Sequence, residues 1–246
     1  MVEDRITNGH GRAVERFAET LAGRALIDRV TAYFSASLEG LEHIPRRGGA
    51  LLVANHGMNG FDGIVLGALL RREIGRLPFW LAERNLWRIP GFGRLADFID
   101  AVPGERGSAV SILRRGELVV VYPGGIRDSF KLSTQRRRLQ WGRRSGFARV
   151  VMEAGVPIVP LAAHGVDDMY TTVAREPWLG RALLGDHKYD LPISFGRWGT
   201  VVPRPVRVTI RALPPVATAG DPYSEADVER VRAAVFDAVQ TELERG

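Results

Sequence analysis

The sequence predicts an α/β fold: a single layered domain with a mixed central sheet flanked by helices. Three observations support this prediction. Short apolar runs of strand length alternate along the chain with segments of helical periodicity. The 246 residues, 45% of them hydrophobic, are enough to bury one sizeable core. No internal repeat or low-complexity tract interrupts this alternation, so we divide the chain only into an amino-terminal helical segment, residues 1–38, and a main domain, residues 39–246.

The amino-terminal segment is predicted to contain an amphipathic helix from residue 12 to about residue 38. Such a helix can pack on its own domain, or it can lie on a surface of anionic lipid. The sequence leaves both interpretations open. Apolar residues recur there at near-helical spacing, with arginines between them, and the apolar series is Val14, Phe17, Leu21, Ile27, Val30 and Phe34.

Strands are predicted where short apolar or alternating runs follow turn residues. Residues 51–54 come after a turn with proline and glycine and are apolar throughout. Residues 117–122 form the clearest buried strand, and residues 206–213 alternate as a half-buried or edge strand does. The complete set of predicted strands is 51–54, 78–81, 98–102, 117–122, 157–163 and 206–213.

Four further helices are predicted, at residues 63–74, 107–115, 146–154 and 224–243. The last helix has Ser224 as its N-cap and a row of valines on one face. Residues 170–203 are rich in tryptophan, proline and glycine and show no clear periodicity, so we expect an excursion over a site.

The composition limits the classes of function. There is no cysteine, which excludes disulfides and thiolate chemistry. The net charge of +6 favours an anionic partner: a membrane surface, a nucleic acid or a phosphorylated substrate. No segment reaches the roughly 20 apolar residues of a membrane span, and the first residues are polar and include acids. We therefore expect a cytoplasmic protein that is soluble or peripheral to a membrane.

The most informative segment joins an apolar strand to a histidine. Residues 50–54 are apolar and lead through Asn55 to His56, and Asp62 follows at the start of the next apolar segment. A carboxylate within reach of an imidazole fixes its tautomer and stabilises its protonated form, so this pair can act as a general base. The alternatives are that His56 has a structural role and that Asp62 caps the following helix.

Four segments occur in a fixed order. The first holds His56 and Asp62, the second is residues 98–100 leading to Arg106, the third is residues 122–127, and the fourth is residues 156–160. Their order and spacing resemble the four motif blocks of the glycerolipid acyltransferase superfamily, which includes 1-acylglycerol-3-phosphate acyltransferases. The resemblance covers roughly residues 40 to 170 and implies a glycerol-phosphate-acyltransferase-like fold.

This resemblance implies transfer of an acyl group from a thioester, acyl-CoA or acyl carrier protein, to a lipid hydroxyl. His56 would take the proton of the hydroxyl, and Asp62 would orient His56 and stabilise its positive charge. The thioester would be a substrate, so no cofactor is expected, and no histidine–carboxylate spacing indicates a metal. The residues expected to bind substrate are Asn55, Arg106, Gly124, Gly125 and Arg127.

The chain departs from the usual blocks in two places. Five residues separate His56 from Asp62, where the usual block has four. Gly124 stands where the usual third block, Pro-Glu-Gly-Thr-Arg, has its glutamate, and Asp128 can supply a carboxylate nearby. Both changes resemble the neutral-lipid branch, related to diacylglycerol and phytyl-ester acyltransferases. They favour a less charged alcohol over lysophosphatidic acid as the acceptor.

The arginines allow several interpretations. Arg127 matches the third-block arginine, which implies that it could bind a phosphate of the acceptor or of CoA; the alternative is an ion pair with Asp128 or a cap at the sheet edge. Arg106 matches the second block only loosely. A dense basic cluster at residues 136–144 surrounds Trp141. It is either a solvated face or a contact for a membrane or for the phosphates of CoA. A nucleic-acid role would rest on charge alone, so we expect no nucleic-acid partner.

The expected partners are therefore an acyl thioester donor, a lipid acceptor and an anionic membrane surface, with the protein peripheral to the inner face of the membrane. Two alternatives remain at this stage. The chain could be a catalytically weak lipid-binding protein of the same fold, or a thioesterase-like hydrolase that uses the same pair of residues with water as the acceptor.

Overall fold

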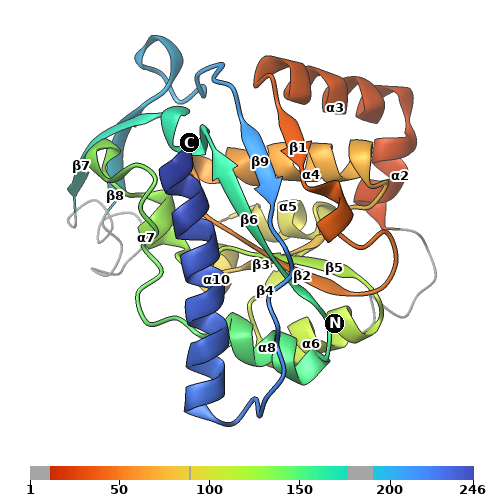
Figure 1. Ribbon diagram of the computed structural model, residues 1–246. Helices are drawn as coiled ribbons and strands as arrows, with labels where there is room; N and C mark the ends of the chain where they lie inside the picture. Colours follow the sequence, from red (N-terminus) through yellow and green to blue (C-terminus); the bar gives the residue numbers. More distant parts are fainter. Residues whose placement is uncertain (1–11, 89, 177–190) are drawn as a thin grey trace.

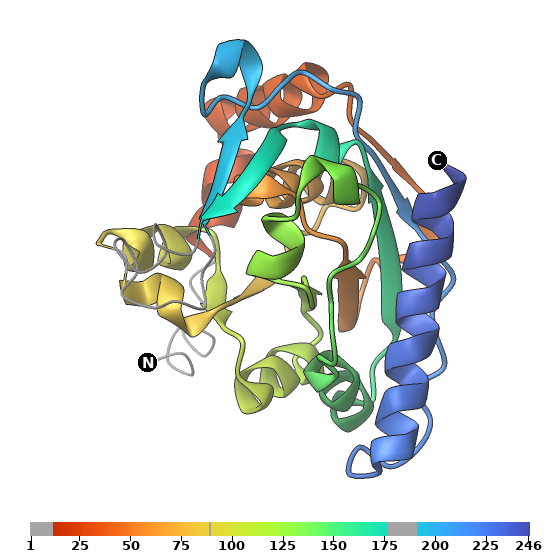
Figure 2. The same ribbon diagram turned by 90° about the vertical axis from the view of Figure 1, so that its left-hand side faces the viewer.

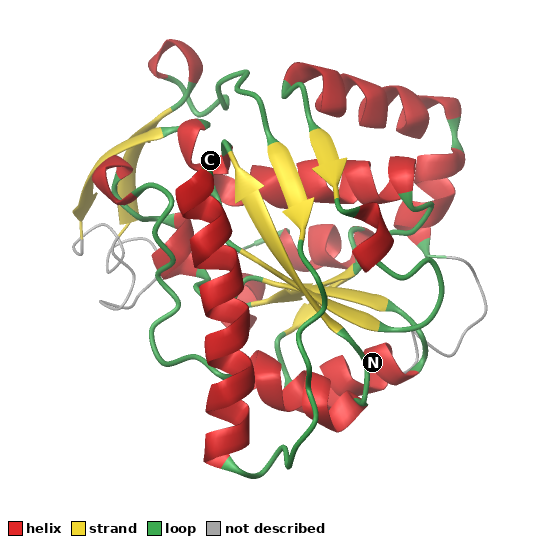
Figure 3. Ribbon diagram, viewed as in Figure 1, coloured by secondary structure: helices red, strands yellow, loops and turns green. Residues whose placement is uncertain are grey.

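The computed structural model describes residues 12–88, 90–176 and 191–246. Its centre is a seven-stranded sheet with the strand order β1-β9-β6-β2-β5-β3-β4. Figures 1 and 3 show this sheet with helices around it. A separate antiparallel hairpin, β7 with β8, stands at one side. The strands are β1 (Ser37–Glu39), β2 (Ala50–Ala54), β3 (Phe79–Ala82), β4 (Ala101–Pro103), β5 (Leu118–Val121), β6 (Ile158–His164), β7 (Thr171–Glu176), β8 (Leu191–Phe195) and β9 (Thr209–Ala212).

Strand direction decides where a site can form. Strands β4, β3, β5, β2 and β6 are parallel, whereas β9 is antiparallel to β6 and carries β1 alongside it. The predicted mixed sheet is thus confirmed. The carboxyl ends of the five parallel strands meet at one edge, which is where ligands bind in open α/β sheets.

Helices cover both faces of the sheet, so the core has two halves (Figures 1 and 2). Leu52 and Ala54 of β2 pack with α4 on one side, whereas Leu51 and Val53 pack with α6, α8 and α10 on the other. This alternation is what a strand buried on both faces produces. The helices are α2 (Ala13–Glu19), α3 (Leu21–Tyr33), α4 (Phe61–Glu73), α5 (Phe92–Phe98), α6 (Arg106–Arg114), α7 (Ile126–Ser129), α8 (Gly146–Ala154) and α10 (Glu225–Arg245).

The amino-terminal helix differs from the prediction. It breaks at Thr20, which is extended and caps α3 by accepting a hydrogen bond from the amide of Gly23. Helix α2 then packs closely against α3. Glycine allows this approach at position 23, since a Cβ there would lie 2.0 Å from the carbonyl oxygen of Phe17. The expected helix over residues 34–38 is wrong, since Ser37–Glu39 form β1 in the main sheet. The division of the chain at residue 38 stays a prediction.

Two other segments also differ. Phe98 ends α5 and Asp100 has a positive φ of 57°, so only residues 101–102 of the expected strand 98–102 are extended, as the first two residues of β4. Strand β9 lies between β1 and β6 and is not an edge strand. Within the expected excursion 170–203 the structure describes the hairpin β7–β8, and residues 177–190 lie outside the described residues.

Candidate functional site

Asn55 fixes the exit of the chain from β2. It is fully buried, and its side-chain amide donates to the carbonyl oxygen of Ala163 on β6 at 2.9 Å and accepts from the amide of Ala163 at 2.8 Å. The side chain thus continues the pairing of β2 with β6 beyond the last strand residue. Asn55 was predicted to bind substrate, and the structure places its amide on the neighbouring strand.

His56 and Asp62 form a hydrogen-bonded pair. Nδ1 of His56 lies 2.8 Å from Oδ2 of Asp62, and the same oxygen accepts from the amide of Gly57 at 3.0 Å. The additional residue of this loop is taken up by a short 3₁₀ turn in which Asn59 and Gly60 have φ values of 58° and 73°. Helix α4 can therefore begin at Phe61, which brings Asp62 back to the imidazole.

The charges around His56 favour its protonated form. Burial by itself would lower the pKa of the imidazole, but the charge and hydrogen bond of Asp62, together with the charge of Asp128, outweigh burial. The pKa of His56 therefore lies above the usual 6.5. Because Asp62 holds Nδ1, the free nitrogen is Nε2, and a neutral His56 can accept a proton there.

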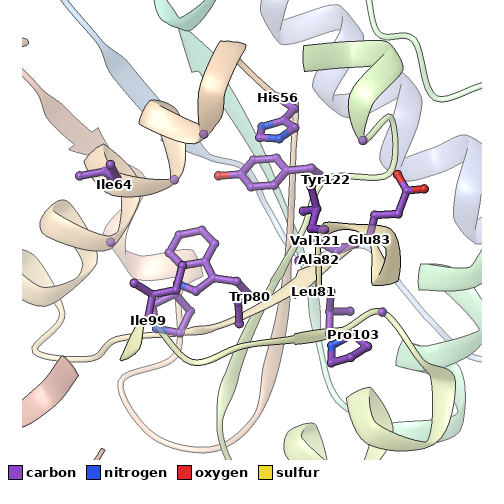
Figure 4. A pocket seen from close by; sticks show the side chains of 18 of the residues that line it. His56, Ile64, Trp80, Leu81, Ala82, Glu83, Ile99, Pro103, Val121 and Tyr122 are labelled. Carbon is purple, nitrogen blue, oxygen red and sulfur yellow. The ribbon is translucent and has the colours of Figure 1, made fainter. Parts of the chain in front are cut away.

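Two aromatic rings lie below His56, as Figure 4 shows. The ring of Tyr122 stacks on the imidazole at a centroid distance of 4.1 Å, and Trp80 lies parallel to Tyr122 at 6.4 Å. Burial, and then the negative charge of Asp62, raise the pKa of the Tyr122 hydroxyl well above its usual value. Tyr122 therefore stays neutral and forms a flat wall beneath the base.

A cavity of about 1030 Å³ opens beside this pair. That volume is at the upper end of ordinary ligand pockets, about 300–1,000 Å³. We call one group of its lining residues the apolar part: Leu26, Ile27, Ile64, Gly67, Trp80 and Ile99. We call a second group the charged part: Arg84, Glu105, Arg106, Arg144 and Arg149. The apolar part suits a hydrocarbon chain.

Most arginines of the charged part already have a carboxylate partner. Arg84 pairs with Glu105, Arg106 with Glu153, and Arg149 with Glu225. Arg106 also stacks over the ring of Tyr223. Arg144 is different, because the hydrogen bonds described for it go to the carbonyl oxygens of Pro123 and Gly124.

Arg127 does not line the cavity. It is exposed, and its guanidinium lies near Gly142, where an added Cβ would be 3.9 Å from Nη1. The arginine beside the turn 123–125 is Arg144, which comes from the basic cluster. The same cluster offers no exposed aromatic ring, since Trp141 is 1% exposed. The sequence marked Arg144 only as one charge among several.

The two glycines of the third segment lie in different surroundings. Gly125 lines the cavity with a φ of 50°, and its amide donates to the carbonyl oxygen of Tyr122 at 2.9 Å. Gly124 is buried, and a Cβ there would lie 2.2 Å from the Cβ of Asp128. The space above Gly124 is therefore occupied by Asp128, as the sequence suggested when it placed a carboxylate nearby.

Asp128 belongs to a buried charged cluster behind the His56 loop. Its carboxylate accepts from the amide of His56 at 2.9 Å and from Nζ of Lys131 at 3.3 Å. Lys131 also contacts Asp167 at 3.0 Å, and these interactions raise the pKa of its ammonium group despite burial. Lys131 and Asp167 were not predicted from the sequence to belong to the site. The available signal was that Lys131 is one of two lysines in a chain rich in arginine.

Known proteins resemble this chain in sequence and in fold. A family described as Acyltransferase matches residues 35–164. The human "DGAT1/2-independent enzyme synthesizing storage lipids" is 34% identical over 159 residues, which is 65% of this chain and 48% of that protein. The chain thus spans about half the length of this curated relative.

Two further matches cover more of the chain. An uncharacterized protein of Mycobacterium tuberculosis (strain ATCC 25618 / H37Rv) is 30% identical over 219 residues, 87% of this chain and 61% of that protein. The crystal structure of the 1-acyl-sn-glycerophosphate (LPA) acyltransferase PlsC from Thermotoga maritima has a TM-score of 0.53 at 19% identity and covers 96% of this chain and 87% of that chain. At this identity the second match shows the fold.

Proposed function

The chain belongs to the acyltransferase family, and from this premise we propose that it moves a fatty acyl group from a thioester to a lipid hydroxyl with His56 as the general base. The observation that carries the proposal is the hydrogen-bonded pair of His56 and Asp62 beside a cavity with an apolar part. The donor is acyl-CoA or acyl carrier protein and is a substrate, so the proposed reaction uses no cofactor or metal.

In the proposed reaction, Nε2 of His56 takes the proton of the acceptor hydroxyl while the hydroxyl oxygen attacks the thioester carbonyl carbon. Asp62 keeps the other proton on Nδ1 and stabilises the imidazolium that forms. The tetrahedral intermediate then collapses, and the carbon–sulfur bond breaks. The thiolate takes the proton from His56, so the products are an ester and a free thiol.

The placement of the predicted binding residues refines their proposed roles. Arg106 and Gly125 line the cavity, and we assign substrate contact to them and to Arg144. Asn55 and Gly124 contribute through the backbone: the first fixes the His56 loop, and the second leaves room for a carboxylate. We assign no contact at the reacting centre to Arg127, which is exposed outside the cavity.

The acceptor that fits this cavity best is an uncharged lipid alcohol. Three of the four arginines of the charged part are paired with carboxylates, so little positive charge is left for a phosphomonoester. Arg144 remains for an anionic group of the thioester donor. A relative that synthesises storage lipids agrees with a neutral product.

The test is an assay with purified protein, radiolabelled acyl-CoA and separate acceptors: lysophosphatidic acid, diacylglycerol and a long-chain alcohol. The proposal expects labelled ester with a neutral acceptor. Product with lysophosphatidic acid alone would overturn the acceptor class. Labelled free acid at the same rate with and without acceptor would identify a thioesterase. If no product forms with acyl-CoA or with acyl-acyl carrier protein as the donor, the alternative of a lipid-binding protein is favoured.

The length of acyl chain that the protein prefers should depend on Gly67, which faces Trp80 in the apolar part. Gly67→Leu should lower kcat/KM for long-chain donors about 15-fold relative to short-chain donors, because two excluded methylenes at about 0.8 kcal/mol each cost about 1.6 kcal/mol. Gly67→Ala is the control, since a Cβ there would lie 3.4 Å from the Trp80 ring. An unchanged donor preference in the leucine variant would place the acyl chain elsewhere.

We also propose that the protein is peripheral to the inner, cytoplasmic face of a membrane. Among the described residues, none of the helices has both the length and the apolar character that a membrane span requires. Exposed apolar side chains lie on α2, α3, α4 and α5, helices that contribute to the lining of the cavity: Phe17, Leu21, Leu26, Ile64, Leu95 and Phe98. Exposed arginines at positions 16, 24 and 29 accompany them on α2 and α3, as suits an anionic lipid surface.

Leu21→Glu with Leu26→Glu should release the protein from vesicles of anionic phospholipid. These side chains are 86% and 50% exposed, so the exchange removes apolar contact without disturbing the core. Cosedimentation with vesicles measures the bound fraction. Val173→Glu on β7, also at an exposed apolar position, is the matched control. Equal binding of both variants would remove α3 from the proposed membrane contact.

A further inference from the structure

Asp128 and the side chain of residue 124 compete for the same space. A Cβ at Gly124 would lie 2.2 Å from Cβ and 2.9 Å from Cγ of Asp128, closer than nonbonded carbon atoms approach. Only one of the two positions can therefore carry a side chain in this backbone. In this chain that position is Asp128, and its carboxylate is completely buried.

Both oxygens of Asp128 are used. Oδ2 accepts from the amide of His56 at 2.9 Å, while Oδ1 accepts from the amide of Gln140 at 3.1 Å and from Lys131 at 3.3 Å. The next residue, Ser129, donates through its hydroxyl to the carbonyl oxygen of Gly57 at 2.7 Å. Helix α7 thus holds the backbone of two successive residues of the His56 loop.

We propose that Asp128 is a positioning residue for His56: its carboxylate fixes the backbone of the catalytic loop and places a second negative charge beside the imidazole. Asp62 acts on the ring itself, whereas Asp128 acts from behind through the main chain. The effect on catalysis rests on the proposed function, but the effect on the imidazole does not.

The charged and titratable groups around the imidazole come from several elements. Asp62 on α4 and Asp128 on α7 are the acids, Tyr122 stacks from the end of β5, and Lys131 follows α7. Burial lowers the pKa of His56, the two acids raise it, and Lys131 lowers it. Removing the charge of Asp128 should therefore lower this pKa.

The first experiment compares Asp128→Asn with Asp168→Asn, whose side chain is 44% exposed and pairs with Arg136. NMR titration of the imidazole resonances, with His56 assigned by its absence in His56→Ala, gives the pKa in each folded protein. We expect a lower His56 pKa in Asp128→Asn and no shift in the control. kcat/KM should fall at least about tenfold, because small misplacements of a catalytic group can cost about 10²-fold.

The second experiment moves the carboxylate. Asp128→Gly should lose activity, and adding Gly124→Glu should restore at least about a tenth of the wild-type kcat/KM, because the new side chain enters the space that Asp128 leaves. Its Cβ would still lie 3.1 Å from Cδ1 of Trp141, so the indole has to shift slightly. Gly124→Glu alone should fail, since its Cβ meets Asp128. If Asp128→Asn does not fold, comparing Asp128→Gly with the double variant decides whether a carboxylate in this space positions His56.

The outcomes separate the two proposals. A folded Asp128→Asn with the wild-type His56 titration and wild-type kcat/KM would overturn the positioning role. A folded variant with Asp128→Gly and Gly124→Glu that recovers neither the His56 titration nor kcat/KM would also overturn it. If the wild-type protein transfers no acyl group, the proposed function fails, and the NMR titration still decides whether Asp128 acts on His56.

Discussion

Replacing His56 by alanine should lower kcat for acyl transfer by about 10²–10⁴-fold, the usual contribution of a general base. The side chain is 19% exposed, and the contacts described for its ring are a hydrogen bond to Asp62 and a stack on Tyr122, so the protein should remain folded. Initial rates with radiolabelled acyl-CoA and a neutral acceptor measure the loss. Thermal unfolding followed by circular dichroism checks the fold.

His43→Ala is the matched control for this substitution. Its side chain is also partly exposed, at 27%, and its contact is with Glu42 at the surface. The control should keep the wild-type rate. If His56→Ala retained full activity in the same assay, another group would have to take the hydroxyl proton, and the proposed mechanism would be wrong.

Asp62→Asn should cost up to about 10⁴-fold in kcat, because it changes the tautomer of His56. The carboxylate accepts the Nδ1 proton, whereas an asparagine amide can donate to Nδ1 and shift the proton to Nε2. The nitrogen that faces the cavity would then no longer accept a proton. The volume of the side chain barely changes, so a loss of rate reports on hydrogen bonding.

The dependence of kcat/KM on pH gives an independent test of the direction in which Asp62 shifts the pKa of His56. His56 acts as a base only when it is neutral, so activity rises as the pH rises through its pKa, which lies above 6.5 in the wild-type protein. Asp62 raises that pKa, and therefore the acid limb of Asp62→Asn should move to lower pH while the plateau falls. An acid limb that moved to higher pH would contradict the charge interaction between these residues.

The same charges affect stability. A histidine whose pKa is raised in the folded state stabilises the protein at low pH, and this contribution is lost as the pH rises through the folded pKa. For His56 the loss thus begins near pH 6.5, the usual histidine value, and is complete above the folded pKa. Activity and this stability contribution therefore change in opposite directions with pH.

Sequence patterns predicted the buried elements well because burial leaves a strong periodic signal. Residues 50–54 and 118–121 are central strands with no polar residue, and they were recognised as such. The patterns failed where one residue changes the backbone direction. Phe17 and Leu21 keep helical spacing across Thr20, so nothing in the periodicity marks the break there. Asp100 lies between Ile99 and Ala101, and no pattern marks its positive φ.

The candidate site shows the same contrast. The pairing of His56 with Asp62 could be predicted because only a short loop separates His56, which follows β2, from Asp62 in the first turn of α4. The cluster of Asp128, Lys131 and Asp167 could not, since it depends on how α7 packs against the residues after β6. Arg127 lies on α7 outside the cavity, whereas Arg144 comes from the loop before α8 and reaches the carbonyl oxygens of Pro123 and Gly124. Charge patterns do not encode which arginine the fold brings to the cavity.

The stack of His56, Tyr122 and Trp80 has a consequence for measurement. Trp80 is half-buried in the wall of the cavity, so an acyl chain that enters would replace water around the indole with methylene groups. A less polar surrounding moves tryptophan emission to shorter wavelength. The protein therefore carries an intrinsic optical reporter of donor binding, and a titration of fluorescence against a non-reactive thioether analogue of the donor would give an affinity without any label or turnover.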